Sequence, residues 1–284
     1  MNYKRSEKIK NYLCLPIIFL LSINVVFSQI KAKTDDGKVV VLNKNGTWHY
    51  QNFRLHKLEL PKTNADNITH HKGFSLQYSE EHEQPLWVAY ELTKSETKNK
   101  FKRTNKFLQD PKISSKTANN KDYSKSGYDR GHLAPASDMG WSKQTMAESF
   151  YYSNISPQRP GFNRGIWKKL ETQVRAWAKE YKAIYVATGP ILNNHSKAIG
   201  KNKVSVPAAF YKVILLVDDN GESKAIGFVM KNARSKSLVK SFATSVDEVE
   251  QQTGLDFFYH LPNYLEEKVE SGLCLNCWSW KSRK

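Results

Sequence analysis

The sequence predicts an α+β fold with a central antiparallel sheet flanked by helices. After residue 74, strand-like and helix-like runs alternate without the regular βαβ repeat of a doubly wound sheet. Two apolar runs, Phe210–Val217 and Lys224–Val229, are joined by Asp219-Asn220-Gly221, residues typical of a tight hairpin turn. The composition, 39% hydrophobic and 12% aromatic over 284 residues, is sufficient for a packed core and excludes wholesale disorder.

The first 28 residues are typical of an export signal. Basic residues lead an apolar run from Tyr12 to Phe27, which ends at Ser28. A retained membrane anchor is the alternative, but the uninterrupted apolar stretch is short for a spanning helix of about 20 residues. We therefore expect cleavage of this signal, no stable membrane anchor afterwards, and a secreted or periplasmic protein.

A small module and a linker are expected between the signal and the main domain. Residues 29–50 combine the run Val39–Leu42 with turn signals at residues 36–37 and 45–46, which indicates a small β-hairpin module. Residues 51–73 are polar, show no clear period and are expected to form a linker. The main domain is then expected over residues 74–272, followed by a tail of residues 273–284.

Further strands and two helices are expected within the main domain. Leu86–Leu92 and Ala183–Thr188 are strand candidates. Apolar residues recur at three- and four-residue steps over residues 163–181, which predicts one amphipathic helix. A second helix is expected within Ser245–Gln252, and Gly254 would end it.

The charge balance points to anionic partners. The chain has 44 Lys and Arg against 27 Asp and Glu, a formal net charge of +17, which raises the local concentration of polyanions. Nucleic acid, anionic membrane and acidic glycan are the candidates. The lysine-rich passage Lys94–Lys125 is either a solvated loop or a loop that grips phosphates.

Cys274 and Cys277 in the tail form a C-x-x-C pair, which could be a redox motif, half a zinc site, a local disulfide or idle thiols. Zinc would need further ligands nearby, and a redox motif would be expected at the start of a helix in a βαβ unit. These considerations favour a disulfide or idle thiols. An even pair also agrees with an oxidising destination.

The most informative stretch is Asp129-Arg130-Gly131-His132. It supplies a charge partner, a guanidinium for phosphate, backbone freedom and a proton acceptor that titrates near neutral pH. Hydrolysis of a phosphodiester needs an activated water, shielding of the phosphoryl oxygens and stabilisation of a departing alkoxide. His132 can take the water proton, Arg130 can pair with the phosphate, and a divalent cation could meet the leaving oxygen. One asparagine with a water shell is a sufficient site for Mg²⁺.

Three segments resemble, in this order, the DNA/RNA non-specific endonucleases of the ββα-metal superfamily, which include secreted bacterial nucleases and mitochondrial endonuclease G. They are Asp129–His132, the segment Asn154-Ile155-Ser156-Pro157-Gln158 and the helix opening Asn163-Arg164-Gly165-Ile166-Trp167. The resemblance covers residues 70–270 approximately and continues through Gly189-Pro190, Val206-Pro207, Phe210-Tyr211-Lys212 and Thr253–Phe258. It implies a ββα-metal catalytic motif within the α+β fold.

The resemblance implies roles for five residues. His132 is expected to be the general base, and Asn163 the direct protein ligand of a catalytic Mg²⁺, for which Mn²⁺ could substitute. Glu171 matches the acid that orients the metal's water shell; the alternative is an ordinary exposed helix acid. Arg130 matches an arginine near the scissile phosphate, and Arg103 a second phosphate-contacting arginine. For Arg103, a solvated loop residue is the alternative.

Supporting roles are expected for four more residues. Asn154 and Gln158 match family positions, and hydrogen bonding to the site's backbone fits their chemistry at least as well as substrate contact. Asp129 could orient the general base or the neighbouring arginine, or cap a turn. Gly131 is expected to allow the backbone a close approach to the facing helix.

The implied reaction is metal-dependent hydrolysis of DNA and RNA that leaves 5′-phosphate ends. Contacts to phosphate carry little base information, so we expect little sequence preference and weakening by salt. One alternative is a non-catalytic exported protein that binds DNA or glycans, although such a protein has no need of His132, Asn163 and Glu171 together. Another is a phosphodiesterase for a different substrate. The sequence leaves a homodimer open.

Overall fold

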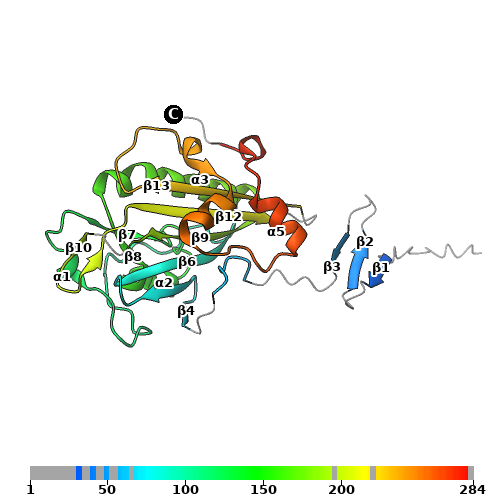
Figure 1. Cartoon of the computed structure of the whole chain (residues 1–284). Coiled ribbons are helices and arrows are strands. Elements are labelled where there is room, and N and C mark those ends of the chain that lie inside the picture. The colour runs from blue at the N-terminus through cyan, green and yellow to red at the C-terminus, as the bar shows by residue number, and fades with distance from the viewer. Residues whose placement is uncertain are drawn as a thin grey trace, which may run out of the picture. The chain divides into compact units, whose positions relative to one another are not determined.

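The computed structural model describes residues 30–33, 39–42, 48–50, 57–63, 67–193, 197–217 and 222–280. The chain divides into two compact units, residues 1–53 and 54–284, and each is described by itself (Figure 1). The expected export signal, residues 1–28, lies outside the described residues. Within the described part, no helix is both long and apolar enough to cross a bilayer.

The N-terminal unit contains a three-stranded antiparallel sheet, in the order β1-β2-β3, so a third strand extends the expected hairpin. The central strand is β2 (Val39–Leu42), which pairs with β1 (Ile30–Lys33) and β3 (Trp48–Tyr50). Val40 in this strand is buried, and β-branched side chains favour such positions. The turn signals at residues 36–37 and 45–46 lie outside the described residues.

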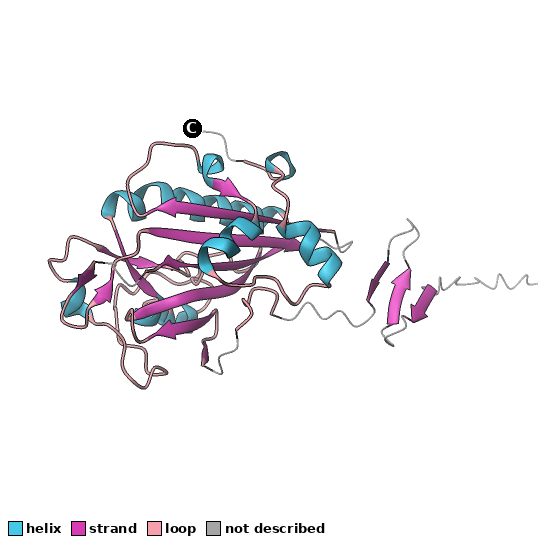
Figure 2. Ribbon diagram, viewed as in Figure 1, coloured by secondary structure: helices cyan, strands magenta, loops and turns pink. Residues whose placement is uncertain are grey.

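The main unit is built on a seven-stranded antiparallel sheet in the order β14-β13-β12-β9-β6-β5-β4 (Figures 1 and 2). This confirms the predicted α+β class, and the four strands expected in this domain are present. The strands are β4 (Ile68–His70), β5 (Ser75–Ser79), β6 (Gln84–Thr93), β9 (Ala183–Ile191), β12 (Ala209–Val217), β13 (Ser223–Lys231) and β14 (Ala243–Thr244). Two short ladders join β7 (Asp129–His132) to β8 (Ile155–Gln158) and β10 (Ala198–Ile199) to β11 (Val204–Ser205).

Helices cover both faces of the sheet. On one face, Trp177 of α3 (Lys168–Glu180) stacks on Phe228 of β13, with ring centroids 6.3 Å apart. Side chains alternate between the faces of a strand, so Gly227 faces the other side. There a Cβ at Gly227 would lie 2.7 Å from Val249 of α4 (Val246–Thr253), so α4 covers the opposite face, beside α5 (Asn263–Glu270) (Figure 1). Among the described residues there are also α1 (Asn120–Tyr123), α2 (Lys143–Glu148) and the 3₁₀ turns Tyr152–Asn154, Val239–Phe242 and Leu275–Cys277.

The helix expected within residues 245–252 is confirmed as α4, and local chemistry explains both of its ends. The Ser245 side chain accepts a hydrogen bond from the Glu248 backbone N–H at 3.2 Å, which caps the first turn. At the other end Gly254 has φ of 69°, a left-handed conformation that glycine adopts without strain.

The helix expected over residues 163–181 is interrupted. Its first part, Phe162–Trp167, is a π-helical segment (η2) in which Gly165 has φ −105° and ψ −110°, outside the helical region. The regular helix α3 follows directly. The apolar periodicity persists across the break, because Ile166 and Trp167 are both buried, and this explains why the sequence pattern does not reveal it.

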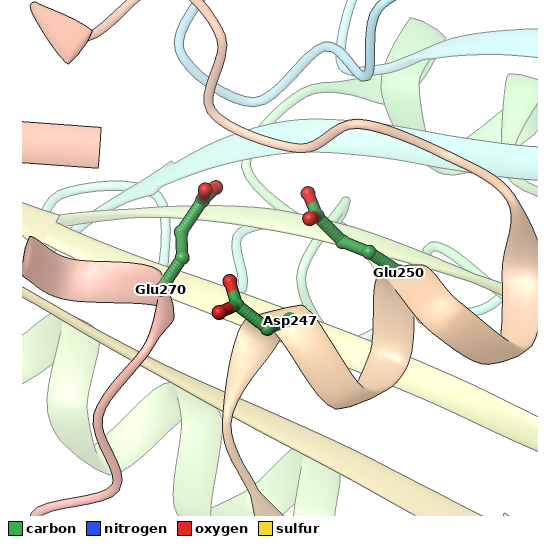
Figure 3. A group of neighbouring side chains, drawn as sticks. All are labelled: Asp247, Glu250 and Glu270. Atoms are coloured by element: carbon green, nitrogen blue, oxygen red, sulfur yellow. The ribbon is translucent and has the colours of Figure 1, made fainter. Parts of the chain in front are cut away.

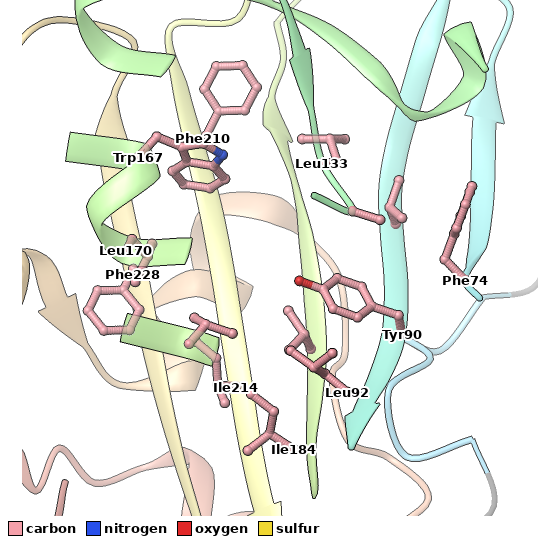
Figure 4. Close-up of a cluster of buried hydrophobic side chains, with 14 of the residues drawn as sticks. Phe74, Tyr90, Leu92, Leu133, Trp167, Leu170, Ile184, Phe210, Ile214 and Phe228 are labelled. Carbon is pink, nitrogen blue, oxygen red and sulfur yellow. The ribbon is translucent and has the colours of Figure 1, made fainter. Parts of the chain in front are cut away.

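The main hydrophobic core lies between the sheet and the segment η2–α3 (Figure 4). The sheet contributes fully buried side chains such as Tyr90, Ile214 and Phe228, and the helical segment contributes Trp167 and Leu170. Burial of one such apolar side chain stabilises the fold by about 1.5–3 kcal/mol. This core fixes the helix that carries the candidate site residues against the strands.

The folded unit extends beyond the predicted domain of residues 74–272 at both ends. β4 precedes residue 74, and Lys62, within the expected linker, forms a 2.9 Å ion pair with Asp256. In the expected tail, Trp278 is 4% exposed and packs on Trp177 at a ring-centroid distance of 4.5 Å. The polar composition of the expected linker and tail does not predict these contacts, because only single residues within each segment make them. Of the alternatives for the tail cysteines, the structure has the disulfide between Cys274 and Cys277.

Candidate active site

The antiparallel strand pair of β7 and β8 positions the first group of candidate residues. In its antiparallel register, Gly131 pairs with Ser156 and His132 with Ile155. A Cβ at Gly131 would lie 2.2 Å from Cδ of Gln158, so a larger residue here would force the Gln158 side chain to move. The close approach is therefore to Gln158 on the paired strand, and not to the facing helix as the sequence suggested.

His132 is held as a neutral imidazole between aromatic rings. Its ring lies 4.7 Å from Phe150 and 5.6 Å from Phe107, between centroids, and the residue is 9% exposed. Burial, and next the positive charge of Arg103, lower the pKa of His132 to about 3, while a hydrogen bond to the Arg130 backbone opposes the shift. Nε2 is buried and has no hydrogen-bond partner among the residues that the structure describes. Its lone pair is therefore available to accept a proton at neutral pH once water reaches it.

Arg130 is fixed by partners that the sequence analysis did not single out. Its Nε donates to the Tyr152 hydroxyl at 2.8 Å, and its Nη2 donates to the Asn120 carbonyl at 3.3 Å. The guanidinium also lies over the Phe107 ring, 5.3 Å from the centroid. These contacts leave Nη1 for a ligand. A surface pocket of about 500 Å³ adjoins the arginine and includes Phe107, Asn120 and Tyr152 in its lining.

Asp129 links strand β7 to the start of the helical segment η2. Its Oδ2 accepts a hydrogen bond from Asn163 Nδ2 at 2.9 Å, and Arg164 donates to both of its carboxylate oxygens at 2.6 and 2.8 Å. Asp129 therefore orients the Asn163 side chain, a role that the sequence did not suggest. Because the amide nitrogen of Asn163 is the donor, its Oδ1 remains available as a hard oxygen ligand.

Glu171 lies in the first turn of α3 among positive charges. Its carboxylate makes no hydrogen bond with any residue that the structure describes, so both oxygens are open. Burial raises the pKa of Glu171, and the nearby charges of Arg175, Lys212 and Arg103 oppose that effect. An amide oxygen on Asn163 and a free carboxylate on Glu171 fit a hydrated Mg²⁺, which takes few protein oxygens and keeps several waters.

A buried charged network lies behind Glu171. Asp138 is fully buried and accepts hydrogen bonds from Arg175 Nη1 at 2.7 Å and from the Tyr90 hydroxyl at 3.0 Å. Lys212 on β12 is also fully buried, with Nζ 5.0 Å from the Trp167 ring centroid. Sequence reasoning missed this network. A lysine within the apolar run of β12 was the available signal, since lysine is rarely fully buried unless it is paired with an opposite charge.

Arg103 connects the two halves of the site. It lies on the irregular loop that precedes α1, with its guanidinium 5.1 Å from the Phe150 ring centroid. Its charge acts on both His132 and Glu171, so the three side chains are neighbours. The loop is anchored farther along by Asp110, whose buried carboxylate lies 2.7 Å from His71 Nε2. Arg103 therefore faces the site rather than bulk solvent alone.

The other supporting residues lie behind the site. Asn154 is fully buried; its Oδ1 accepts from the Ala134 N–H at 2.9 Å, and its Nδ2 donates to the Ala134 and Ser149 carbonyls. Its amide is thus committed to the backbone that follows His132. Gln158 is fully buried, and its amide atoms have no hydrogen-bond partner among the described residues. The cysteine pair lies apart from this group, in the tail that packs on Trp177.

Comparison with known proteins identifies the family. The model of the DNA/RNA non-specific endonuclease family matches residues 51–263. The mitochondrial nuclease EXOG of Danio rerio is 37% identical over 76% of this chain and 66% of its own length. The mitochondrial endonuclease G of Homo sapiens is 34% identical over 63% of this chain and 64% of its own length. The crystal structure of the EndoG/EndoGI complex, a study of EndoG inhibition, matches with a TM-score of 0.69 and 34% identity, over 74% of this chain and 91% of that one.

The α+β fold and the family match define the class of protein. The chain belongs to the DNA/RNA non-specific endonuclease family, which confirms the resemblance seen in the sequence. It spans somewhat less than two thirds of the length of the two relatives named above. The predicted secreted or periplasmic location is wrong by this comparison, because those relatives are mitochondrial nucleases. The prediction rested on the composition of residues 1–28 and on a cysteine pair, and neither property identifies a compartment.

Proposed function

We propose that this chain hydrolyses phosphodiester bonds in DNA and RNA with little sequence preference. The observation that carries the proposal is the open Nε2 acceptor of neutral His132 beside two arginines, with Asn163 tied to the same strand through Asp129. Membership of the non-specific endonuclease family supports the same reaction.

Each protein group has a defined task in this reaction. His132 Nε2 accepts the proton of the attacking water, while the bond from its ring to the Arg130 backbone keeps the lone pair on Nε2. Arg130 pairs with a non-bridging phosphate oxygen through Nη1. When bound at Asn163, Mg²⁺ supplies positive charge for the phosphoryl oxygens and the leaving 3′ oxygen. Glu171 accepts hydrogen bonds from the waters of this site, and the products carry 5′-phosphate ends.

Arg103 controls access to the base in this proposal. Nε2 of His132 is buried, so water reaches it only when a neighbouring side chain moves. Arg103 is exposed and lies on an irregular loop, which makes it the most readily displaced neighbour. A substrate phosphate that draws Arg103 away also removes a charge that lowers the pKa of His132. Substrate binding would then uncover the base and strengthen it in one movement.

The test is cleavage by the purified full-length chain of supercoiled plasmid, single-stranded DNA and RNA. With Mg²⁺ or Mn²⁺ we expect all three to be cut, with 5′-phosphate ends detected by ligation, and with EDTA we expect none to be cut. Added salt should slow cleavage, because the contacts are to phosphates. Retention of DNA without cleavage in any metal would instead support the polyanion-binding alternative, and cleavage of small diesters alone would support the phosphodiesterase alternative.

A further inference from the structure

Three carboxylates converge on the face of the sheet opposite to the candidate active site (Figure 3). Asp247 and Glu250 come from α4, and Glu270 is the last residue of α5. One oxygen from each lies within 4.8 Å of the others. In Figure 3 the three side chains point toward a common space between the two helices. We refer to these three residues as the carboxylate cluster.

The environment of Glu270 indicates a missing ligand. The residue is 5% exposed, and its Oε1 is buried without a hydrogen-bond partner in the described part of the chain. Buried carboxylate oxygens in folded proteins are normally bonded, because leaving them unbonded costs their full desolvation. Glu270 also ends α5, where the negative end of the helix dipole disfavours an anion. A cation placed between the three carboxylates would satisfy both the oxygen and the dipole.

The charges around Glu270 have the same sign. Burial, followed by the carboxylates of Glu250, Glu266, Asp247 and Asp256, raises the pKa of Glu270 to about 9. The nearby Lys62 is exposed and already forms a 2.9 Å ion pair with Asp256.

Glu250 is positioned by the backbone. Its Oε1 accepts a hydrogen bond from the Phe257 N–H at 2.7 Å, which fixes the carboxylate, and no described residue hydrogen-bonds to its second oxygen.

We propose that the carboxylate cluster binds Ca²⁺ and thereby ties α4 to α5. Two oxygens on opposite sides of a Ca²⁺ ion, each about 2.4 Å from it, are about 4.8 Å apart, so one ion can reach three oxygens that lie within 4.8 Å of one another. Three carboxylates leave room for the waters that complete the six to eight ligands of this ion. The site is separate from the Asn163 site, because α4 and α3 lie on opposite faces of the sheet. Its role is structural.

The test is thermal unfolding of the metal-stripped full-length chain with and without millimolar CaCl₂. We expect Ca²⁺ to raise the Tm of the wild type by at least about 3 °C. Glu270→Gln and Asp247→Asn should lose most of this rise, and calorimetry should show binding weakened more than about tenfold. The matched control is Glu248→Gln, an exposed glutamate on the same helix, which should respond as the wild type does.

Two further arms separate this site from the active site. Asn163→Ala should keep the Ca²⁺-dependent rise in Tm, and Glu270→Gln should keep Mg²⁺-dependent cleavage of DNA at 25 °C. If Glu270→Gln does not fold, Asp247→Asn at the partly exposed position provides the same comparison. No rise in the wild type, or a rise that survives in both cluster variants, overturns the proposal.

Discussion

The main unit has two centres of buried charged groups, the candidate active site with its charged network and the carboxylate cluster, and they differ in how charge is compensated. On the α3 face, buried Asp138 is bonded to Arg175, and Lys212 offsets the charge of Glu171. On the α4–α5 face, the carboxylate cluster brings acidic groups together, and a buried oxygen of Glu270 has no partner among the described residues. The first centre is balanced by the chain's own residues. The second is balanced only by a proton or a metal cation taken from solution, so the two should respond differently to mutation, metal and pH.

The largest expected effect separates the centres by activity. His132→Ala should lower kcat for plasmid cleavage by about 10³-fold, because His132 is the group proposed to take the proton from the attacking water. Substitutions in the carboxylate cluster should leave kcat unchanged. Retention of DNA on a filter in EDTA and the circular dichroism spectrum should both persist, and His70→Ala at an exposed histidine is the control. More than a tenth of wild-type kcat in His132→Ala would contradict its role as base.

The next effect compares the two centres by stability. Asp138→Asn should lower the free energy of unfolding by about 3 kcal/mol, because Arg175, whose side chain is 16% exposed, then lacks its counter-charge. Glu270→Gln in chelator should not lower it and should raise it at neutral pH, because the wild-type carboxyl must take up a proton on folding and glutamine avoids that cost. Urea unfolding measures both. Equal losses in the two variants would show that the difference in charge balance has no energetic consequence.

A smaller effect follows from pH. The ordinary pKa of Glu270 is 4.5 and the folded value is about 9, so the folded state binds its proton more tightly. The resulting stabilisation is complete below pH 4.5 and is lost as pH rises toward 9. In chelator, the stability of the wild type relative to Glu270→Gln should therefore fall across this range. Ca²⁺ should reverse the trend, and a pH-independent difference between the two proteins would exclude a buried, titrating Glu270.

The smallest effect concerns the base. Since the pKa of His132 is about 3, kcat/KM should not fall through protonation of the base between pH 7 and pH 5. Arg103→Gln removes a charge that lowers this pKa, so the acid limb of the profile should move toward neutral pH. Lys102→Gln, at the exposed neighbouring position, is the matched control. An acid limb at the same pH in Arg103→Gln and wild type would place Arg103 away from the base.

Most residues of the site could be predicted from the sequence, but the contacts between them could not. Motif order identified the β7 residues Asp129–His132 and the helix residues Asn163 and Glu171. The structure brings these two segments into contact through Asp129. The partner of Asp129 lies 34 residues away, and that of Asp138 lies 37 residues away. No local pattern encodes such distant pairs. The same reason hid Tyr152 as the partner of Arg130, and the carboxylate cluster, whose members come from two helices.

The sequence by itself determined the elements whose causes are local. Strand periodicity located β6, β9, β12 and β13, and Ser245 and Gly254 bounded α4 through their own hydrogen bonding and backbone preference. The tertiary structure alone decided the break at Gly165, the open nitrogen of His132 and the unbonded oxygen of Glu270. These depend on which distant atoms exclude water from a group, and desolvation is set by the whole fold rather than by neighbours along the chain.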